Sequence, residues 1–175
     1  MYRSRTTRAF SLVELVIVIV ILGIIAAVAI PRISSGSRNA GESALRADLA
    51  SLRNAIDWYY GEHNNKFPAQ VGDGTNAAVT EAAFINQLTM YSDATGSVSA
   101  NKDPLFPYGP YIRGDFPRLP LGDNKGQATV TVVNLATPLA ATPADGNGWV
   151  YNTQTGEIIA NADDAANDGT TYDTW

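Results

Sequence analysis

The sequence predicts an α+β fold in which one long amino-terminal α-helix packs on a small antiparallel β-sheet. Two patterns in the first part of the chain predict the helix: a long apolar segment, and then apolar residues that recur every three or four positions. Short runs of alternating or β-branched residues near the carboxyl end, separated by Gly- and Asn-containing turns, predict the sheet. With 175 residues, the chain has room for about one domain.

The composition excludes several classes of function. The chain has no Cys, which rules out disulfides, Cys-based zinc sites and Cys nucleophiles. Its single His, His63, cannot form a multi-histidine metal site, and we expect a capping or solvated residue at a helix end. The net charge is −5, and residues 126–175 contain no Lys or Arg, so we expect no nucleic-acid partner. Because the known catalytic motifs are absent from the sequence, we expect no enzymatic activity.

A short basic segment precedes a long apolar one at the amino terminus. Residues 1–9 contain Arg3, Arg5 and Arg8 and no acid, whereas residues 10–31 are almost entirely apolar. As a helix, the apolar segment would be about 30 Å long, which is the thickness of the hydrocarbon core of a bilayer. Positive charges stay on the cytoplasmic side. The sequence therefore predicts a cytoplasmic leader over 1–9 and a transmembrane helix over 10–31.

Two simpler interpretations of the apolar segment stay open. The small residues Ala27-Val28-Ala29 are compatible with a secretory cleavage site, which would make Ile30 the first residue of the mature chain. A plain membrane anchor for a periplasmic domain is the second. Neither explains Glu14, because a carboxylate at the centre of a bilayer costs about 2.5–3.5 kcal/mol, and less near its interface. Glu14 therefore either lies at the interface or needs a cation from outside the segment, because residues 10–31 contain no Lys or Arg.

The residues around Glu14 resemble a known processing signal. Arg8-Ala9-Phe10-Ser11-Leu12-Val13-Glu14, followed by the apolar segment, is similar to the amino-terminal signal of type IV prepilins and type II secretion pseudopilins. The resemblance implies that a prepilin peptidase cuts between Ala9 and Phe10 and methylates the new amine. It also implies that Glu14 pairs with the α-amino group of Phe10 on a neighbouring subunit. Most family members have Gly in place of Ala9.

The resemblance implies a structural subunit of a filament, most like a major pseudopilin of type II secretion, with a pilin-like fold. The absence of Cys favours this function over that of the many type IV pilins that contain a disulfide. The alternatives are a type IV pilin serving adhesion, motility or DNA uptake, and a membrane-tethered binding domain that never polymerises. The implied partners are further copies of the chain, the prepilin peptidase, an assembly platform membrane protein with its ATPase, and membrane lipid before assembly.

The resemblance also implies where the chain resides. We expect a single-pass protein of the inner membrane with its amino terminus in the cytoplasm and its head in the periplasm. After assembly, the subunit would belong to a periplasmic or extracellular filament.

The second half of the predicted helix, residues 32–63, is amphipathic. Pro31 is expected to kink the helix where the apolar segment ends, because it lacks an N–H group. Five apolar residues spaced 4-3-4-3 form one stripe, and we expect them to pack on the head: Leu45, Leu49, Leu52, Ile56 and Tyr59. Glu42–Arg46 and Arg53–Asp57 are expected to form pairs along the helix surface.

The globular head is predicted over residues 64–161. A short helix from Thr80 to Tyr91 has Thr80 as its N-cap, and Pro104 to Pro120 is expected to wrap over the core in an extended conformation. A strand is predicted from Ala128 to Val133, and Gly148 to Asn161 is predicted to form a hairpin that turns at Gly156.

The last segment, residues 162–175, is predicted to be an acidic tail. It contains four Asp residues, at 163, 164, 168 and 173. Pseudopilins of type II secretion bind calcium in a carboxyl-terminal loop, so the resemblance makes calcium an alternative here. The Asp-x-Asp-x-Asp-Gly order of a calcium loop is absent, however. We therefore favour a solvated tail and expect no cofactor.

Overall fold

The computed structural model describes residues 11–175, with the side chains of residues 28–35 left undescribed. In chain order the elements are α1 (Leu12–Glu62), α2 (Glu81–Thr89), β1 (Tyr91–Ser92), β2 (Val98–Ser99), β3 (Val130–Val133), the 3-10 turn η1 (Pro143–Asp145), β4 (Trp149–Asn152), β5 (Ile158–Ala160) and the 3-10 turn η2 (Tyr172–Thr174). The chain divides into two compact units, residues 1–39 and residues 40–175. The α+β class is confirmed.

Helix α1 remains helical through Pro31. The kink expected there stays a prediction. Among the described residues, no helical stretch combines the length and the hydropathy that spanning a bilayer requires.

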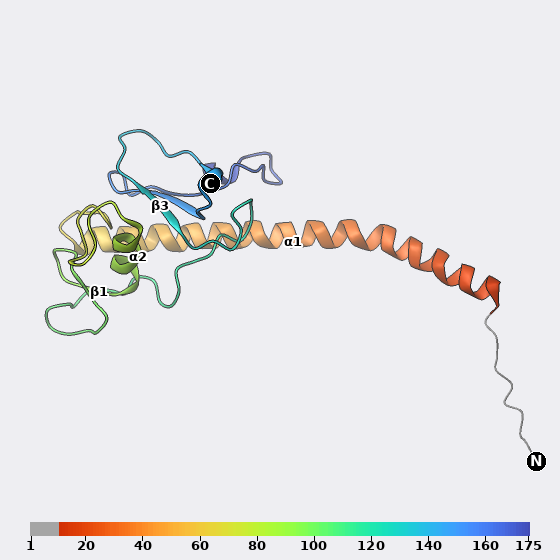
Figure 1. The fold of residues 1–175 in the computed structure, drawn as a ribbon, viewed down its shortest axis with the longest axis horizontal. Coiled ribbons are helices and arrows are strands. Elements are labelled where there is room, and N and C mark those ends of the chain that lie inside the picture. The colour runs from red at the N-terminus through yellow and green to blue at the C-terminus, as the bar shows by residue number, and fades with distance from the viewer. Residues whose placement is uncertain (1–10) are drawn as a thin grey trace, which may run out of the picture. The chain divides into compact units, whose positions relative to one another are not determined.

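The core of the second unit lies between α1, α2 and the carboxyl-terminal sheet (Figure 1). The five residues of the α1 stripe are at most 1 % exposed. Every residue of β4 is also buried, and Trp149 and Tyr151 are the largest side chains that the sheet adds to the core. The ring of Tyr151 stacks on Phe84 of α2, with the ring centroids 4.0 Å apart. This contact joins α2 to the sheet within the same core cluster as the α1 stripe.

The three-stranded sheet is mixed. Strands β4 and β5 pair antiparallel, as the predicted hairpin requires, and Gly156 lies in the turn between them with φ +74°. Strand β3 pairs with β4 in parallel, with Val130 opposite Trp149. A parallel pair needs a long connection that carries the chain back to the same end of the sheet, and residues 134–148 supply it. The smaller pair, β1 with β2, is antiparallel.

Helix α2 begins where its sequence predicts. The Thr80 hydroxyl accepts a hydrogen bond from the Ala83 amide at 3.3 Å, which satisfies one of the free N–H groups at the helix start. Ala83, Phe84, Gln87 and Leu88 are buried, and Ile85 is partly buried against the core. The Gln87 side chain accepts from the Ala69 amide and donates to the Gly96 carbonyl, so its burial costs no unsatisfied group.

The segment from Pro104 to Pro120 wraps over the core without helix, as predicted. The amides of Tyr111 and Ile112 both donate to the carbonyl oxygen of Leu88 at 2.9 Å, which ties the segment to the end of α2. The indole N–H of Trp149 donates to the Pro117 carbonyl at 3.0 Å. These bonds satisfy backbone groups that a non-helical segment would otherwise leave unpaired.

His63 caps the end of α1, as expected, but the expectation that it could be solvated is wrong. The ring is 1 % exposed and stacks on Tyr59 with the ring centroids 3.7 Å apart. Its Nδ1–H donates to the Tyr59 carbonyl at 2.8 Å, and its Nε2 accepts from the Ser92 hydroxyl at 2.9 Å. Burial disfavours the imidazolium and lowers the His63 pKa, although the Tyr59 carbonyl and the nearby Glu62 and Asp93 carboxylates act in the opposite direction.

The carboxyl-terminal segment also differs from the expected solvated tail. Ala162, Ala166 and Tyr172 are buried in the core cluster, and Trp175 packs against it. These apolar residues are interspersed among the acids of the segment, and their burial holds the segment against the core. The four Asp side chains lie on or near the surface around them, and Asp163, Asp164 and Asp168 are exposed.

Candidate assembly site on the amino-terminal helix

The first described turn of α1 carries the carboxylate that the sequence singles out. The helix begins at Leu12, and the Leu15 amide donates to the Ser11 carbonyl at 3.2 Å. Glu14 therefore lies in the first turn, where the free N–H groups of the helix give a partial positive charge. A carboxylate gains about 0.3–1 kcal/mol at that position. Glu14 is exposed, so its carboxylate is open to a further partner.

The residues after Glu14 form an apolar helix that presents its side chains outward on all sides. Twelve large apolar side chains are 42–77 % exposed: Leu12, Val13, Leu15, Val16, Ile17, Val18, Ile19, Val20, Ile21, Leu22, Ile24 and Ile25. Each such side chain gains about 1.5–3 kcal/mol on leaving water. A helix that is apolar all round requires apolar surroundings.

The predicted site residues fall into separate parts of the chain. Ala9 and Phe10, the predicted processing site, lie outside the described residues, and so does the side chain of Pro31. Glu14 belongs to the first compact unit and the buried stripe from Leu45 to Tyr59 to the second. The assembly residue and the head-packing residues are therefore two distinct features of one helix.

A set of charged side chains that joins α1 to the carboxyl-terminal segment was missed by sequence reasoning. The Arg53 guanidinium donates to the carbonyl oxygens of Trp175 at 2.8 Å and Ile158 at 3.2 Å. The Arg46 guanidinium carbon lies 3.7 Å from the centroid of the Trp175 ring, a cation–π contact. These arginines were expected to pair along the helix instead. The two arginines lie seven residues apart beside the apolar stripe. This spacing places them on the side of the helix that faces the head, and it could have predicted their contacts.

Buried Glu42 extends the same connection. Its Oε1 accepts hydrogen bonds from the Asn167 amide at 2.9 Å and from the Tyr172 hydroxyl at 3.3 Å. Asp168 lies 3.6 Å from Arg46, and its carboxylate also accepts from the Thr170 side chain and amide. Those hydrogen bonds, and then the Arg46 charge, lower the pKa of Asp168. The carboxyl-terminal segment is thus held to α1 by polar contacts as well as by packing.

Within the described residues, no group of three or more His, Asp or Glu side chains is placed to hold a metal ion. The Asp73 carboxylate accepts from four donors of its own chain: the amides of Thr75 and Asn76 and the side chains of Asn76 and Asn86. Desolvation raises the pKa of Asp73, but the hydrogen bonds outweigh it and the net direction is downward. This carboxylate stabilises the loop before α2.

The amino-terminal residues match a described family motif. Residues 4–30 match the family model for the prokaryotic N-terminal methylation motif. The relatives found by comparison are all named type II secretion system core protein G. The chain is 29 % identical to the protein of Aeromonas hydrophila over 118 residues, 67 % of this chain and 81 % of the relative. It is 30 % identical to that of Klebsiella michiganensis over 89 residues, 51 % of this chain and 61 % of the relative.

Over residues 4–30 the chain carries this methylation motif, and over its longer matches it is similar to type II secretion core protein G. The match to the core protein G of Pectobacterium carotovorum, 35 % identical over 74 residues, covers 42 % of this chain and 46 % of the relative. The matched region thus covers about half to two thirds of the length of the Pectobacterium and Klebsiella relatives, and a larger share of the Aeromonas relative. No solved structure matches it. The methylation motif covers Glu14 and the exposed apolar residues that follow it.

Proposed function

We propose that the chain is a structural subunit of a type II secretion pseudopilus and supports protein secretion. The observation that carries this proposal is the apolar helix behind the methylation motif, which exposes large apolar side chains all round and a single carboxylate, Glu14, in its first turn. An exposed apolar surface of this kind is unfavourable for an isolated protein in water. It fits a subunit that moves from a membrane into the core of a filament.

The first step in this proposal is processing by a prepilin peptidase. Cleavage between Ala9 and Phe10 removes Arg3, Arg5 and Arg8 and creates a new α-amino group, which is then methylated. Before assembly, the subunit resides in the inner membrane with its head in the periplasm. Its further partners are the assembly platform membrane protein and the associated ATPase.

Assembly then exchanges lipid for neighbouring helices around the apolar segment. Because lipid tails and apolar side chains are similar surroundings, this exchange gains little hydrophobic free energy. The specificity must therefore come from packing and charge. Glu14 supplies the charge when it pairs with the α-amino group of Phe10 on a neighbouring subunit. A subunit inserted out of register would leave both charges unpaired, which costs about 3–5 kcal/mol.

The head is held by the stripe on the later part of α1. Leu45, Leu49, Leu52, Ile56 and Tyr59 are covered by the head's own core, so they are not free to contact other subunits. Pro31 separates this stripe from the apolar segment in the sequence, and we propose that it allows the helix to bend during assembly. The part of α1 that enters the filament core is then the part that leaves its side chains exposed.

The experiment compares Glu14→Leu with a matched control, Leu15→Ile, which changes a neighbouring apolar residue and keeps the carboxylate. The Glu14→Leu subunit should insert and be cleaved but should assemble at least about a hundredfold less, the factor that corresponds to about 3 kcal/mol. Leu15→Ile should assemble normally. Filaments of Glu14→Leu at the normal yield would contradict the proposed role of Glu14, whereas an unchanged chain that forms no filaments would favour a tethered domain that does not polymerise.

A further inference from the structure

Two large apolar side chains stand out on the surface of the second unit. Trp58 on α1 is 67 % exposed, and Leu105 in the loop after β2 is 74 % exposed. The other exposed large apolar residues described in that unit, Val79 and Leu135, are less exposed, at 36 % and 47 %. Single exposed apolar residues are common on proteins. Their surroundings decide whether these two form a contact surface.

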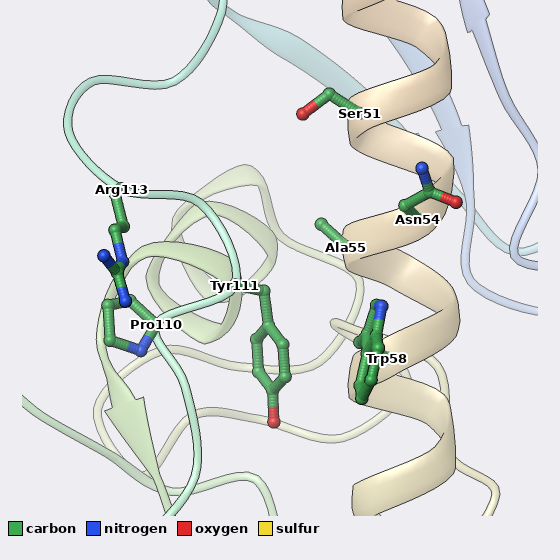
Figure 2. Close-up of a pocket in the computed structure, with 7 residues that line it drawn as sticks. All are labelled: Ser51, Asn54, Ala55, Trp58, Pro110, Tyr111 and Arg113. Atoms are coloured by element: carbon green, nitrogen blue, oxygen red, sulfur yellow. The ribbon is translucent and has the colours of Figure 1, made fainter.

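Trp58 lies between two hollows of opposite charge. One, of about 390 Å³, is lined by Asp57, Trp58, Gly61 and Glu62. The other, of about 400 Å³, lies between α1 and the segment that carries Pro110, Tyr111 and Arg113 (Figure 2). The indole therefore has carboxylates on one side and a guanidinium on the other. A ligand for this surface needs an apolar centre flanked by a cation and an anion.

The loop around Leu105 has those three groups in four consecutive residues. Lys102 and Asp103 come directly before Pro104 and Leu105, and all four are exposed. The Asp103 carboxylate accepts from the Leu105 amide at 2.7 Å and from the Phe106 amide at 3.2 Å, and the Phe106 amide also donates to the Asp103 carbonyl. This tight turn holds the Leu105 side chain outward before any partner arrives, which lowers the entropy cost of binding.

We propose that the Leu105 turn of one subunit docks against Trp58 of the next subunit in the filament. Leu105 covers the indole, Lys102 faces the Asp57 and Glu62 carboxylates, and Asp103 faces the Arg113 guanidinium. Opposite charges across a contact guide its register and select against other arrangements. This inference rests on the proposed function, since it needs a filament in which copies of the head are neighbours.

The two surfaces are different parts of the same chain, so the contact is heterologous. Each subunit offers one turn and one indole, and a contact that does not close into a ring propagates into a helical filament. Trp, Tyr and Arg are the residues that most often dominate the energy of such contacts, and the receiving surface has one of each. The head contact thus adds a second determinant of register to the pairing of Glu14.

Cysteine cross-linking tests the contact directly, because the chain has no Cys of its own. The test variant combines Asp57→Cys with Lys102→Cys and leaves Trp58 and Leu105 in place. The control combines Asp57→Cys with Leu135→Cys, which also places two exposed thiols on the head. Filaments formed in cells are oxidised and separated on a denaturing gel. The test pair should give a ladder of covalent multimers, whereas the control pair and each single variant should give less than a tenth as much.

Charge reversal supplies a second readout that does not depend on thiols. Lys102→Glu should lower the amount of filament at least threefold, and Asp57→Lys in the same chain should restore it. Normal filaments from the test pair without a ladder, or an unrescued Lys102→Glu, would overturn the head contact and leave the proposed function intact. Absence of filaments from the unchanged chain, with every component of the secretion system present, would overturn both.

Discussion

The turn between β4 and β5 provides a prediction whose size can be worked out from the structure. Gly156 has φ +74°, and its amide donates to the Asn152 carbonyl at 2.9 Å. A Cβ atom at this position would lie 2.3 Å from Cε1 and 2.6 Å from Cδ1 of Phe67, whose ring packs against Tyr60 at a centroid distance of 4.4 Å. Gly156→Ala therefore adds a steric clash to backbone strain.

The two costs can be separated with a matched variant. A left-handed conformation costs Ala about 1–2 kcal/mol, and forcing extra volume against a packed ring costs about 1–3 kcal/mol. Gly146 has φ +77°, and a Cβ there would meet nothing within 4 Å. Gly146→Ala should therefore destabilise the protein by about 1–2 kcal/mol, and Gly156→Ala by about 2–5 kcal/mol. In a chain of this size, these correspond to falls in the melting temperature of about 2–8 °C and about 4–20 °C.

The assay is thermal and urea unfolding of the full chain in detergent micelles, followed by circular dichroism. A double-mutant cycle with Phe67→Ala identifies the clash, because removing the ring should recover about 1–3 kcal/mol of the free energy lost in Gly156→Ala. The reasoning is refuted if Gly156→Ala costs no more than Gly146→Ala, or if the Gly156 and Phe67 substitutions are additive.

Two further predictions concern the core around α1. Below about pH 6.5, His63 takes up a proton in the unfolded chain but stays neutral in the folded protein, because burial lowers its pKa; stability should therefore fall as the pH falls. A His63→Phe variant should show a smaller difference in unfolding free energy between pH 7.5 and pH 5.5. An equal difference would contradict the burial of a neutral His63. Leu52→Ala, at a fully buried position, should lower the free energy of unfolding in urea by about 2–5 kcal/mol, while Ser51→Ala on the exposed side should change it by less than about 0.5 kcal/mol; similar effects of the two would be incompatible with the observed packing.

The parts of the fold that the sequence predicts are those that depend on local pattern. The stripe on α1 follows from the 4-3-4-3 spacing, the start of α2 from the Thr80 hydroxyl, and the hairpin from Gly156 between two runs rich in aromatic and β-branched residues. Each feature is set by residues a few positions apart. Glu14 could also be singled out from local sequence alone, because a single carboxylate in an apolar run is recognisable without knowledge of the fold.

The parts that sequence reasoning missed depend on residues far apart in the chain. Alternation along β3 shows which side chains can be buried but not in which direction the strand runs, so its parallel pairing with β4 could not be read. His63 is buried because Ser92 and the rings of Tyr108 and Tyr111 pack around it. The tail appears acidic in composition, yet Tyr172 and its buried alanines pack in the core.

The mass and first residue of the mature protein test the central claim most directly. Intact-mass spectrometry and amino-terminal sequencing would be carried out on the protein purified from its own cells, where the peptidase is present. The account predicts a chain that begins at Phe10, with a methyl group on its α-amino nitrogen. A mature protein that still begins at Met1 would have no α-amino group on Phe10, and one that begins at Ile30 would lack both Phe10 and Glu14. Either result would contradict the proposed pairing.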